Sequence, residues 1–279
     1  AAAAGLGFDG VKVDGCGPAH DIHVWSKSLK ATGRPILLEN CGDNHETWSP
    51  PLPEELKVCD FHMYRVSADI APQFYSTMYN LQFTIPFQAL DQPMSRPNCW
   101  AYPDMLQVGN GMSFVESRTH FSAWCIVSSP LILSFDLSNS TMRSHLWPII
   151  ANPDALAVNQ KWAGHPGRLV ASSSHNFTAG VAHGARCPCC TDPSKCESYD
   201  FPTWQVWVKP QPGGFMAALV INISEEPQDV TVSLKTLGLT TEAAEVRDLW
   251  QGDVRQVSDN LTTHLAPHDC YFVMLRPHQ

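Results

Sequence analysis

Short apolar runs alternate with longer helix-like segments through the first half of the chain, and most of the runs end in an acidic or amide side chain. Near-continuous apolar runs joined by helices are typical of buried parallel strands. The alternation therefore predicts an α/β fold with a parallel sheet. The predicted strands lie at 10–14, 35–40, 58–65, 99–106 and 130–137, and the predicted helices at 19–32, 70–81 and 114–127.

The carboxyl ends of parallel strands share one edge of a sheet, and in a closed β/α barrel that edge forms the active site. Only about five strand–helix units are visible, whereas eight close such a barrel. A lone acid at a strand end is more often a helix cap or a solvated loop residue than a catalytic group. The acids at predicted strand ends are Asp14, Glu39, Asp69, Asp104 and Asp136.

The second half of the chain changes character after the segment 162–167. Short β-rich runs separated by Gly, Pro, Asp and Asn replace the strand–helix alternation, a pattern typical of an antiparallel β-sandwich. We therefore predict two domains, a β/α catalytic part at 1–162 and a sandwich at 163–279. The predicted sandwich strands include 204–208, 215–222, 230–234, 246–250 and 270–275.

Composition excludes some classes of protein. The net charge is −9, and no basic run or basic–aromatic stripe appears, which argues against a nucleic-acid partner. No apolar run reaches the roughly 20 residues that span a bilayer. The nine tryptophans suit binding to the faces of sugar rings, but they suit a well-packed core equally.

Cysteines and glycosylation sequons bear on the compartment. The chain has ten cysteines and four Asn-x-Ser/Thr sequons, at Asn139, Asn176, Asn222 and Asn260. Together these favour a secretory route, with a secreted or a lysosomal or vacuolar destination. The chain opens at Ala1 on a helix-like segment, so we expect it to be a fragment, and the absence of a signal peptide then says nothing about location.

Glycoside hydrolysis needs two carboxyl groups on either side of the scissile bond. Asp14 follows Lys12 by two residues, so both side chains point to the same side of a strand. A cation there can hold a sugar hydroxyl and keep the aspartate ionised. Asp69 follows Arg65 within one short segment. By themselves these residues indicate a polar cluster at strand ends that is compatible with hydrolysis.

Five motifs in register resemble family 27 of the glycoside hydrolases, the α-galactosidase and α-N-acetylgalactosaminidase group. The match runs in order over most of residues 6–165 and resembles the C-terminal domain of the family only in outline. The motifs are Lys12-Val13-Asp14-Gly15-Cys16, Tyr64-Arg65 with Asp69-Ile70, Pro103-Asp104-Met105-Leu106 with Gly109-Asn110, Trp124 to Leu137, and Ala157-Val158-Asn159-Gln160.

The resemblance implies the last five strands of a (β/α)8 TIM barrel followed by an antiparallel β-sandwich. It also implies Asp14 as the nucleophile at the end of the fourth strand and Asp69 as the acid/base at the end of the sixth. The family retains anomeric configuration, so the two carboxyl groups should lie about 5–5.5 Å apart, and the nearby carboxylate should raise the pKa of Asp69. Neither a metal nor a cofactor is implied. The sugar-contacting positions implied are Lys12, Arg65, Asp104 and Met105.

The sequence departs from the family pattern at two places that bear on the substrate. Ala101 and Tyr102 stand where the family has Asn-Asp, and Glu39-Asn40-Cys41 replaces its Cys-Glu-Trp. Glu39 could take the sugar-binding role of that strand. The expected substrate is a terminal α-D-galactoside of an oligosaccharide, glycan or glycolipid. The alternatives are an α-N-acetylgalactosaminide, a β-L-arabinopyranoside, or a non-catalytic carbohydrate-binding remnant.

The resemblance also bears on the missing strands and on the cysteines. The first three barrel strands of the family have no counterpart, so we expect this chain alone to be inactive and prone to aggregation. The family pattern implies a disulfide between Cys41 and Cys59. We expect Cys125 to be a buried free thiol. A loop near His183 could bind zinc, but disulfides of undetermined connectivity suit a secreted protein better; its cysteines are Cys187, Cys189, Cys190 and Cys196.

Overall fold

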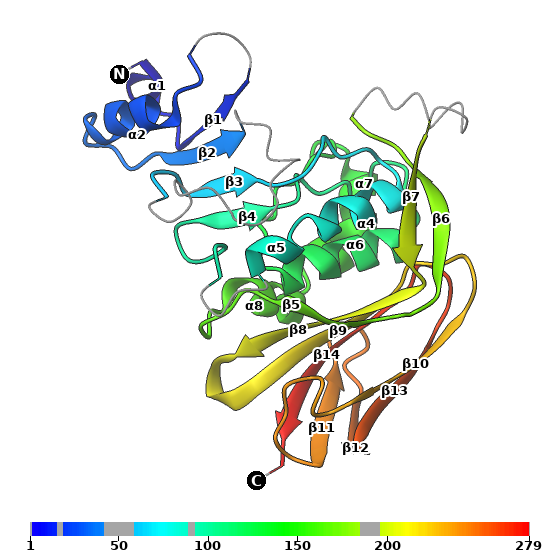
Figure 1. The fold of residues 1–279 in the computed structure, drawn as a ribbon. Helices are drawn as coiled ribbons and strands as arrows, with labels where there is room; N and C mark the ends of the chain where they lie inside the picture. Colours follow the sequence, from blue (N-terminus) through cyan, green and yellow to red (C-terminus); the bar gives the residue numbers. More distant parts are fainter. Residues whose placement is uncertain (1, 16–18, 42–58, 89–92, 185–195, 279) are drawn as a thin grey trace.

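A computed structural model describes residues 2–15, 19–41, 59–88, 93–184 and 196–278. A small parallel sheet lies at one end of the molecule, helices lie in the middle, and a larger antiparallel sheet lies at the other end (Figure 1). The polypeptide crosses from the β/α part to the antiparallel part between α8, which ends at Gln160, and β5, which begins at Arg168.

The parallel sheet has the strand order β1-β2-β3-β4, which confirms the predicted α/β fold class. Each strand pairs in parallel with the next along the chain. The predicted strand at 130–137 is wrong as a regular strand, because only a single parallel bridge joins Leu106 to Leu133 there. Within the described residues, β1 pairs with β2 alone. The strands are β1 (Gly10–Asp14), β2 (Leu37–Cys41), β3 (Met63–Arg65) and β4 (Trp100–Tyr102).

Polar side chains set the starts of several helices. Asp21 caps the helix that follows β1 through the backbone N–H groups of His23 and Val24. Ser113 and Glu116 form a capping box at the start of α6. The helices are α1 (Ala2–Gly5), α2 (Ile22–Lys30), α4 (Phe74–Gln82), α5 (Ile85–Gln88), α6 (Phe114–Ile126), α7 (Ser140–Ile150) and α8 (Pro153–Gln160).

The larger sheet has the order β12-β11-β14-β9-β8-β5, and the pair β10–β13 packs across one face of it. Every pairing among these strands is antiparallel, as the sequence predicts. The strands are β5 (Arg168–Ser172), β8 (Trp204–Gln211), β9 (Phe215–Asn222), β10 (Gln228–Ser233), β11 (Ala243–Asp248), β12 (Val254–Ser258), β13 (Asn260–Leu265) and β14 (Cys270–Pro277).

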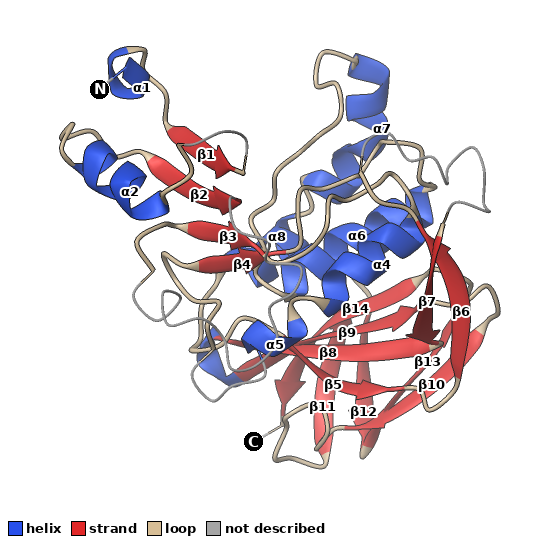
Figure 2. Cartoon of the chain, turned by 45° about the horizontal axis from the view of Figure 1, so that its top comes forward, coloured by secondary structure: helices blue, strands red, loops and turns tan. Residues whose placement is uncertain are grey.

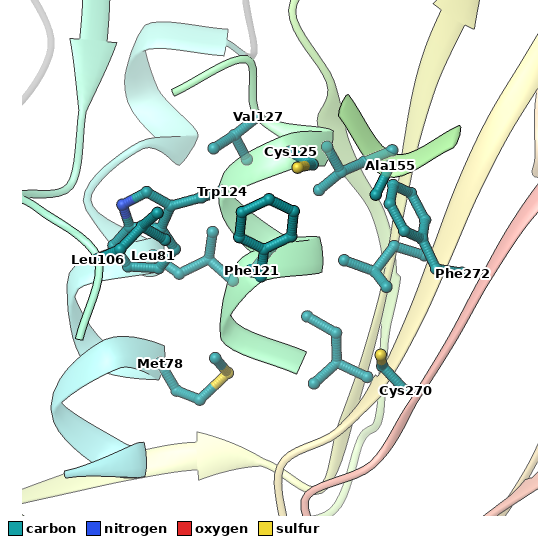
Figure 3. Packing of buried hydrophobic residues seen from close by; sticks show 14 of the residues in the cluster. Met78, Leu81, Leu106, Phe121, Trp124, Cys125, Val127, Ala155, Cys270 and Phe272 are labelled. Carbon is teal, nitrogen blue, oxygen red and sulfur yellow. The ribbon is translucent and has the colours of Figure 1, made fainter. Parts of the chain in front are cut away.

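Both faces of the larger sheet are apolar. Along β9, Leu219 faces the helices while Val220 faces the β10–β13 pair, because successive side chains point to opposite faces of a strand. Helix α6 is buried from Thr119 onward because it lies between this sheet and the rest of the β/α part. In Figure 3, Phe121 of α6 lies among the buried side chains between α4 and β14. One core therefore fixes the sandwich against the barrel helices.

A separate antiparallel hairpin leaves the larger sheet between β5 and β8. It consists of β6 (Asn176–Val181) and β7 (Glu197–Pro202), paired from Asn176 with Pro202 to Val181 with Glu197. Both ribbon views place this hairpin beside α4 (Figures 1 and 2), and β6 contacts that helix directly. The sequence did not predict these two strands.

The predicted disulfide between Cys41 and Cys59 is wrong. Cys59 is bonded to Cys99, with the Cα atoms 6.0 Å apart, and Cys41 is a buried free thiol. The reason is strand direction, because Cys41 ends β2 whereas Cys59 and Cys99 precede β3 and β4, at the opposite edge of the sheet. Cys125 is a buried free thiol, as predicted.

The cysteine-rich loop of the sandwich part is described only in part. Cys196 is disulfide-bonded, which agrees with the expectation of disulfides in this loop. Cys187, Cys189 and Cys190 lie outside the described residues, as does Cys16.

The Cys59–Cys99 bond should contribute measurably to stability. We expect the double substitution Cys59→Ala and Cys99→Ala to lower the free energy of unfolding by about 2–4 kcal/mol, since the bond closes a loop with a sequence separation of 40. Cys41→Ala removes an unpaired thiol and should cost only about 1 kcal/mol. Urea unfolding of the full-length gene product and of these two variants measures both values, and equal losses would contradict the assignment.

One of the four sequons is inaccessible in the folded chain. Asn222 is fully buried, and its Nδ2 donates to the carbonyls of Glu226 at 2.8 Å, Ala266 at 2.9 Å and Leu265 at 3.3 Å. A glycan on that nitrogen would displace these bonds, so the structure contradicts the prediction at Asn222. The other sequons are exposed and stay predictions: Asn139, Asn176 and Asn260.

Candidate active site

The predicted catalytic residues lie at the carboxyl edge of the parallel sheet. Asp14 is the last residue of β1 and is exposed, with its Oδ1 accepting from the Gly15 N–H at 2.7 Å. The strand register places Asp14 opposite Cys41 on β2. Asp69 lies four residues beyond the end of β3, and 67% of its side chain is exposed. Both carboxylates are therefore accessible from the side on which a barrel of this kind binds its ligand.

Lys12 and Glu39 form the first charged pair of the site. They lie opposite each other on β1 and β2, with Lys12 Nζ at 3.2 Å from Glu39 Oε1. The same Glu39 oxygen accepts a hydrogen bond from the Tyr102 hydroxyl at the end of β4. Glu39 is only 6% exposed, so these two partners replace the contacts with water that its carboxyl group lacks. Side chains from β1, β2 and β4 thereby meet at one carboxylate.

Arg65 and Asp104 form the second charged cluster. Arg65 Nη1 lies 2.6 Å from Asp69 Oδ1 and 3.5 Å from Asp104 Oδ2, so one guanidinium joins both acids. Asp104 Oδ2 also accepts from the Ile70 N–H at 3.0 Å, and its Oδ1 accepts from the Met105 N–H at 2.7 Å. Asp104 is 5% exposed, and these bonds make it a support for the backbone next to Asp69.

Packing holds Asp104 in an unfavourable backbone conformation. Its φ is +77°, in the left-handed region that few side chains adopt. The Asp104 carbonyl accepts from the indole N–H of Trp124, which is fully buried in α6, at 2.7 Å. Met105 is half-buried against the core that contains Trp124. The core between the two sheets therefore fixes this loop.

The two cations of the site keep their charge. Burial by itself would lower the pKa of Lys12, but Glu39, together with Cys41 and Asp104, outweighs that effect and the pKa is raised. Burial likewise opposes the charge on Arg65, and Asp104 and Asp69 raise its pKa in turn. Fixed positive charges beside Asp14 and Asp69 suit a site in which negative charge moves between oxygen atoms.

Three other residues near the predicted strand ends are Asp136, Tyr102 and Cys41. Asp136, the remaining strand-end acid, accepts hydrogen bonds from the Ser138 N–H and hydroxyl. It therefore caps a turn and is a loop acid with a structural role. Tyr102, which the sequence marks only as a departure from the family pattern, binds Glu39. Cys41 faces Asp14 across β1 and β2, and burial raises the pKa of its thiol.

Two findings concern metals and membranes. Among the described residues, no three His, Cys, Asp or Glu side chains come together as a set of metal ligands. In the same part of the chain, no helix is long and apolar enough to cross a membrane.

Carboxyl groups at the carboxyl edge of a parallel β/α sheet are the arrangement that barrel glycoside hydrolases use. The family described as "Alpha galactosidase A" matches residues 2–161, and the "Alpha galactosidase C-terminal beta sandwich domain" matches residues 202–275. The chain therefore belongs to the α-galactosidase family, family 27 of the glycoside hydrolases.

Individual relatives and one solved structure agree with this assignment. "Alpha-galactosidase 3" of Arabidopsis thaliana is 28% identical over 98% of this chain and 56% of its own length. The α-N-acetylgalactosaminidase of Rattus norvegicus is 34% identical over 60% of this chain and 42% of its own. The β-L-arabinopyranosidase structure from Geobacillus stearothermophilus covers 99% of this chain and 59% of its own, with a TM-score of 0.75 and 22% identity. The chain thus spans about half the length of the curated relatives it matches.

Proposed function

We propose that this chain carries the two catalytic carboxylates of a retaining hydrolase that cleaves terminal α-D-galactosides. The observation that supports this most strongly is the placement of Asp14 and Asp69, both exposed at one sheet edge, with Lys12 and Arg65 anchored nearby by buried acids. Family membership supports the same reaction. The substrate is a galactose-containing oligosaccharide, glycan or glycolipid, met along the secretory route or in a lysosome or vacuole.

The proposed reaction is a double displacement. In the first step an Asp14 oxygen bonds to the anomeric carbon while the bond from that carbon to the leaving oxygen breaks, and Asp69 gives its proton to that oxygen. In the second step Asp69 takes a proton from water, and the water oxygen displaces Asp14. Arg65 lies against the Asp69 carboxyl group and can orient it for the proton transfer in this step. The retaining separation of about 5–5.5 Å between the two carboxyl groups stays a prediction.

We further propose that the chain acts together with additional barrel strands. The outer edge of β1 has no partner strand in the described residues, and an unpaired parallel edge exposes backbone polar groups. Leu6 and Phe8 beside that edge are 75% and 56% exposed. The matched regions cover only 56% and 42% of the lengths of two relatives. The chain alone is therefore expected to be inactive and to aggregate.

A second substrate class has a specific observation in its favour. The α-N-acetylgalactosaminidase of Rattus norvegicus shares more identity with the chain over its matched region than "Alpha-galactosidase 3" does. Near the site, the carboxylate of Glu39 is held between Lys12 and Tyr102, an arrangement that a sequence departure created. An N-acetylgalactosaminide is therefore the alternative substrate, with a β-L-arabinopyranoside as a third option.

A panel of chromogenic substrates tests the proposed function. The full-length gene product that contains this chain should hydrolyse an α-galactoside about a hundredfold better than an α-N-acetylgalactosaminide or a β-L-arabinopyranoside, measured as kcat/KM. A preference for either of the other two sugars would replace the proposed substrate. A folded protein that binds galactose but cleaves none of the three would make the chain part of a carbohydrate-binding remnant.

A further inference from the structure

The β6–β7 hairpin of the sandwich part is joined directly to the segment that carries Asp69. The Gly184 N–H, just beyond β6, donates to the Asp69 carbonyl at 2.8 Å. The adjacent residues Ile70 and His183 form an antiparallel bridge. A short strip of β-structure thus connects the candidate acid/base to a part of the chain more than a hundred residues away in sequence.

Gln73 makes a second connection between the same two segments. Its Nε2 donates to the Gly180 carbonyl at 2.9 Å, and its Oε1 accepts from the Ala182 N–H at 2.8 Å. Both halves of one side-chain amide are therefore bonded to the end of β6. Gln73 is the residue that precedes α4, four positions after Asp69. It ties the start of α4 to the hairpin.

The contact between hairpin and helix is packed as well as hydrogen-bonded. Ala71 and Ala182 are 0% and 1% exposed and form one small apolar cluster. The ring of Tyr79 on α4 meets the His183 ring edge to face, with the ring centroids 5.0 Å apart. Tyr199 of β7 contacts the same Tyr79 ring at 4.9 Å. The hairpin is thus a rigid neighbour of the loop between β3 and α4.

We propose that the β6–β7 hairpin is a positioning element for the Asp69 carboxyl group, with Gln73 as its positioning residue; this rests on the proposed function. The backbone on one side of Asp69 is held by the barrel part through the Ile70 N–H and Asp104. The carbonyl of Asp69 itself is held by Gly184. The side chain is largely exposed, so its direction depends on these backbone anchors together with its ion pair to Arg65. A proton donor must be held in line with the leaving oxygen, and small displacements are costly.

This role predicts a dependence on the leaving group. An alkyl leaving oxygen needs the proton from Asp69 as its bond to the anomeric carbon breaks, whereas a nitrophenolate leaves readily without it. A misdirected Asp69 should therefore slow the alkyl substrate far more than the nitrophenyl one. A simple loss of folded protein would slow both substrates equally.

Gln73→Ala in the full-length gene product tests the proposal. We expect about a tenfold loss of kcat/KM on an alkyl α-galactoside and less than about twofold on a dinitrophenyl α-galactoside, since the variant removes two hydrogen bonds. Gln82→Ala is the matched control. Gln82 lies at the other end of α4 and bonds to Gln205 of β8, with contacts of 2.7 and 3.3 Å, so it joins the same two parts of the molecule away from Asp69. It should cause no selective loss.

The possible outcomes distinguish the positioning role of the hairpin from the proposed function. Equal losses on both substrates, or the same selectivity in Gln82→Ala, would overturn the positioning role while leaving the proposed function intact. A folded but inactive parent protein would overturn the proposed function and the catalytic role of the hairpin with it. If Gln73→Ala does not fold, Gln73→Glu carries the test, because it keeps the acceptor for Ala182 and loses the donor to Gly180. Gln73→Glu should show the same selective loss on the alkyl substrate.

Discussion

Asp14→Asn in the full-length gene product is expected to lower kcat on every substrate that the parent cleaves by a factor on the order of 10⁴, the scale seen when a covalent nucleophile is removed. The amide cannot form the glycosyl–enzyme bond, and no other described carboxylate occupies the end of β1. KM should change much less than kcat, because the neighbouring cation Lys12 stays bonded to Glu39. Steady-state kinetics on a nitrophenyl substrate measures the effect.

Asp9→Asn is the matched control for that variant. Asp9 lies just before β1, is 91% exposed on its side chain and pairs with Arg34, so the substitution makes the same change of charge far from the sheet's carboxyl edge. Its activity should stay within about twofold of the parent protein, since surface pairs contribute little. Substantial activity in Asp14→Asn would contradict the nucleophile assignment. A large loss in Asp9→Asn would show that a change of net charge, and not the missing nucleophile, lowers the activity.

Asp69→Ala should produce the second large effect, and its size should depend on the substrate. We expect kcat/KM on an alkyl α-galactoside to fall about a thousandfold, within the range that general acid catalysis contributes, and to fall about tenfold or less on a dinitrophenyl α-galactoside. The second step should slow as well, because no base remains to activate water. Kinetics on both substrates measures the two losses.

Azide gives an internal control for Asp69→Ala. An anionic nucleophile needs no base, so added azide should accelerate turnover of the dinitrophenyl substrate in the variant and yield a galactosyl azide of retained configuration. The parent protein should not respond. If azide has no effect and both substrates slow equally, Asp69 is a structural residue that Arg65 holds, and the acid/base must be sought elsewhere.

Much of the fold could be predicted from local patterns in the sequence. The strand at 10–14 and the strand at 215–222 were predicted with the boundaries that the structure shows, because each is a compact run bounded by glycine or polar residues. The strand at 130–137 failed because its apolar residues pack on helices without continuous strand pairing. The hairpin of β6 and β7 was missed because its strands mix exposed polar residues with aromatic rings that pack on α4.

Candidate site residues could be named from the sequence, but their contacts could not. Spacing alone placed Lys12 beside Asp14 and Arg65 beside Asp69, since those pairs are local in sequence. Contacts between distant segments could not be read from spacing, which is why the Tyr102 bond to Glu39 and the Gly184 bond to Asp69 were missed. The wrong disulfide has a different origin. The family resemblance implies the pair Cys41 and Cys59, whereas strand direction puts these residues at opposite edges of the sheet.

Trapping the covalent intermediate tests the central claim most directly. A fluorinated galactosyl substrate that forms the intermediate quickly and releases it slowly would be incubated with the full-length gene product, and peptides would then be mapped by mass spectrometry. The account predicts one added sugar on the peptide that contains Asp14, and none in Asp14→Asn. A label on another carboxylate, or an active protein that accumulates no label, would contradict a retaining mechanism with Asp14 as its nucleophile.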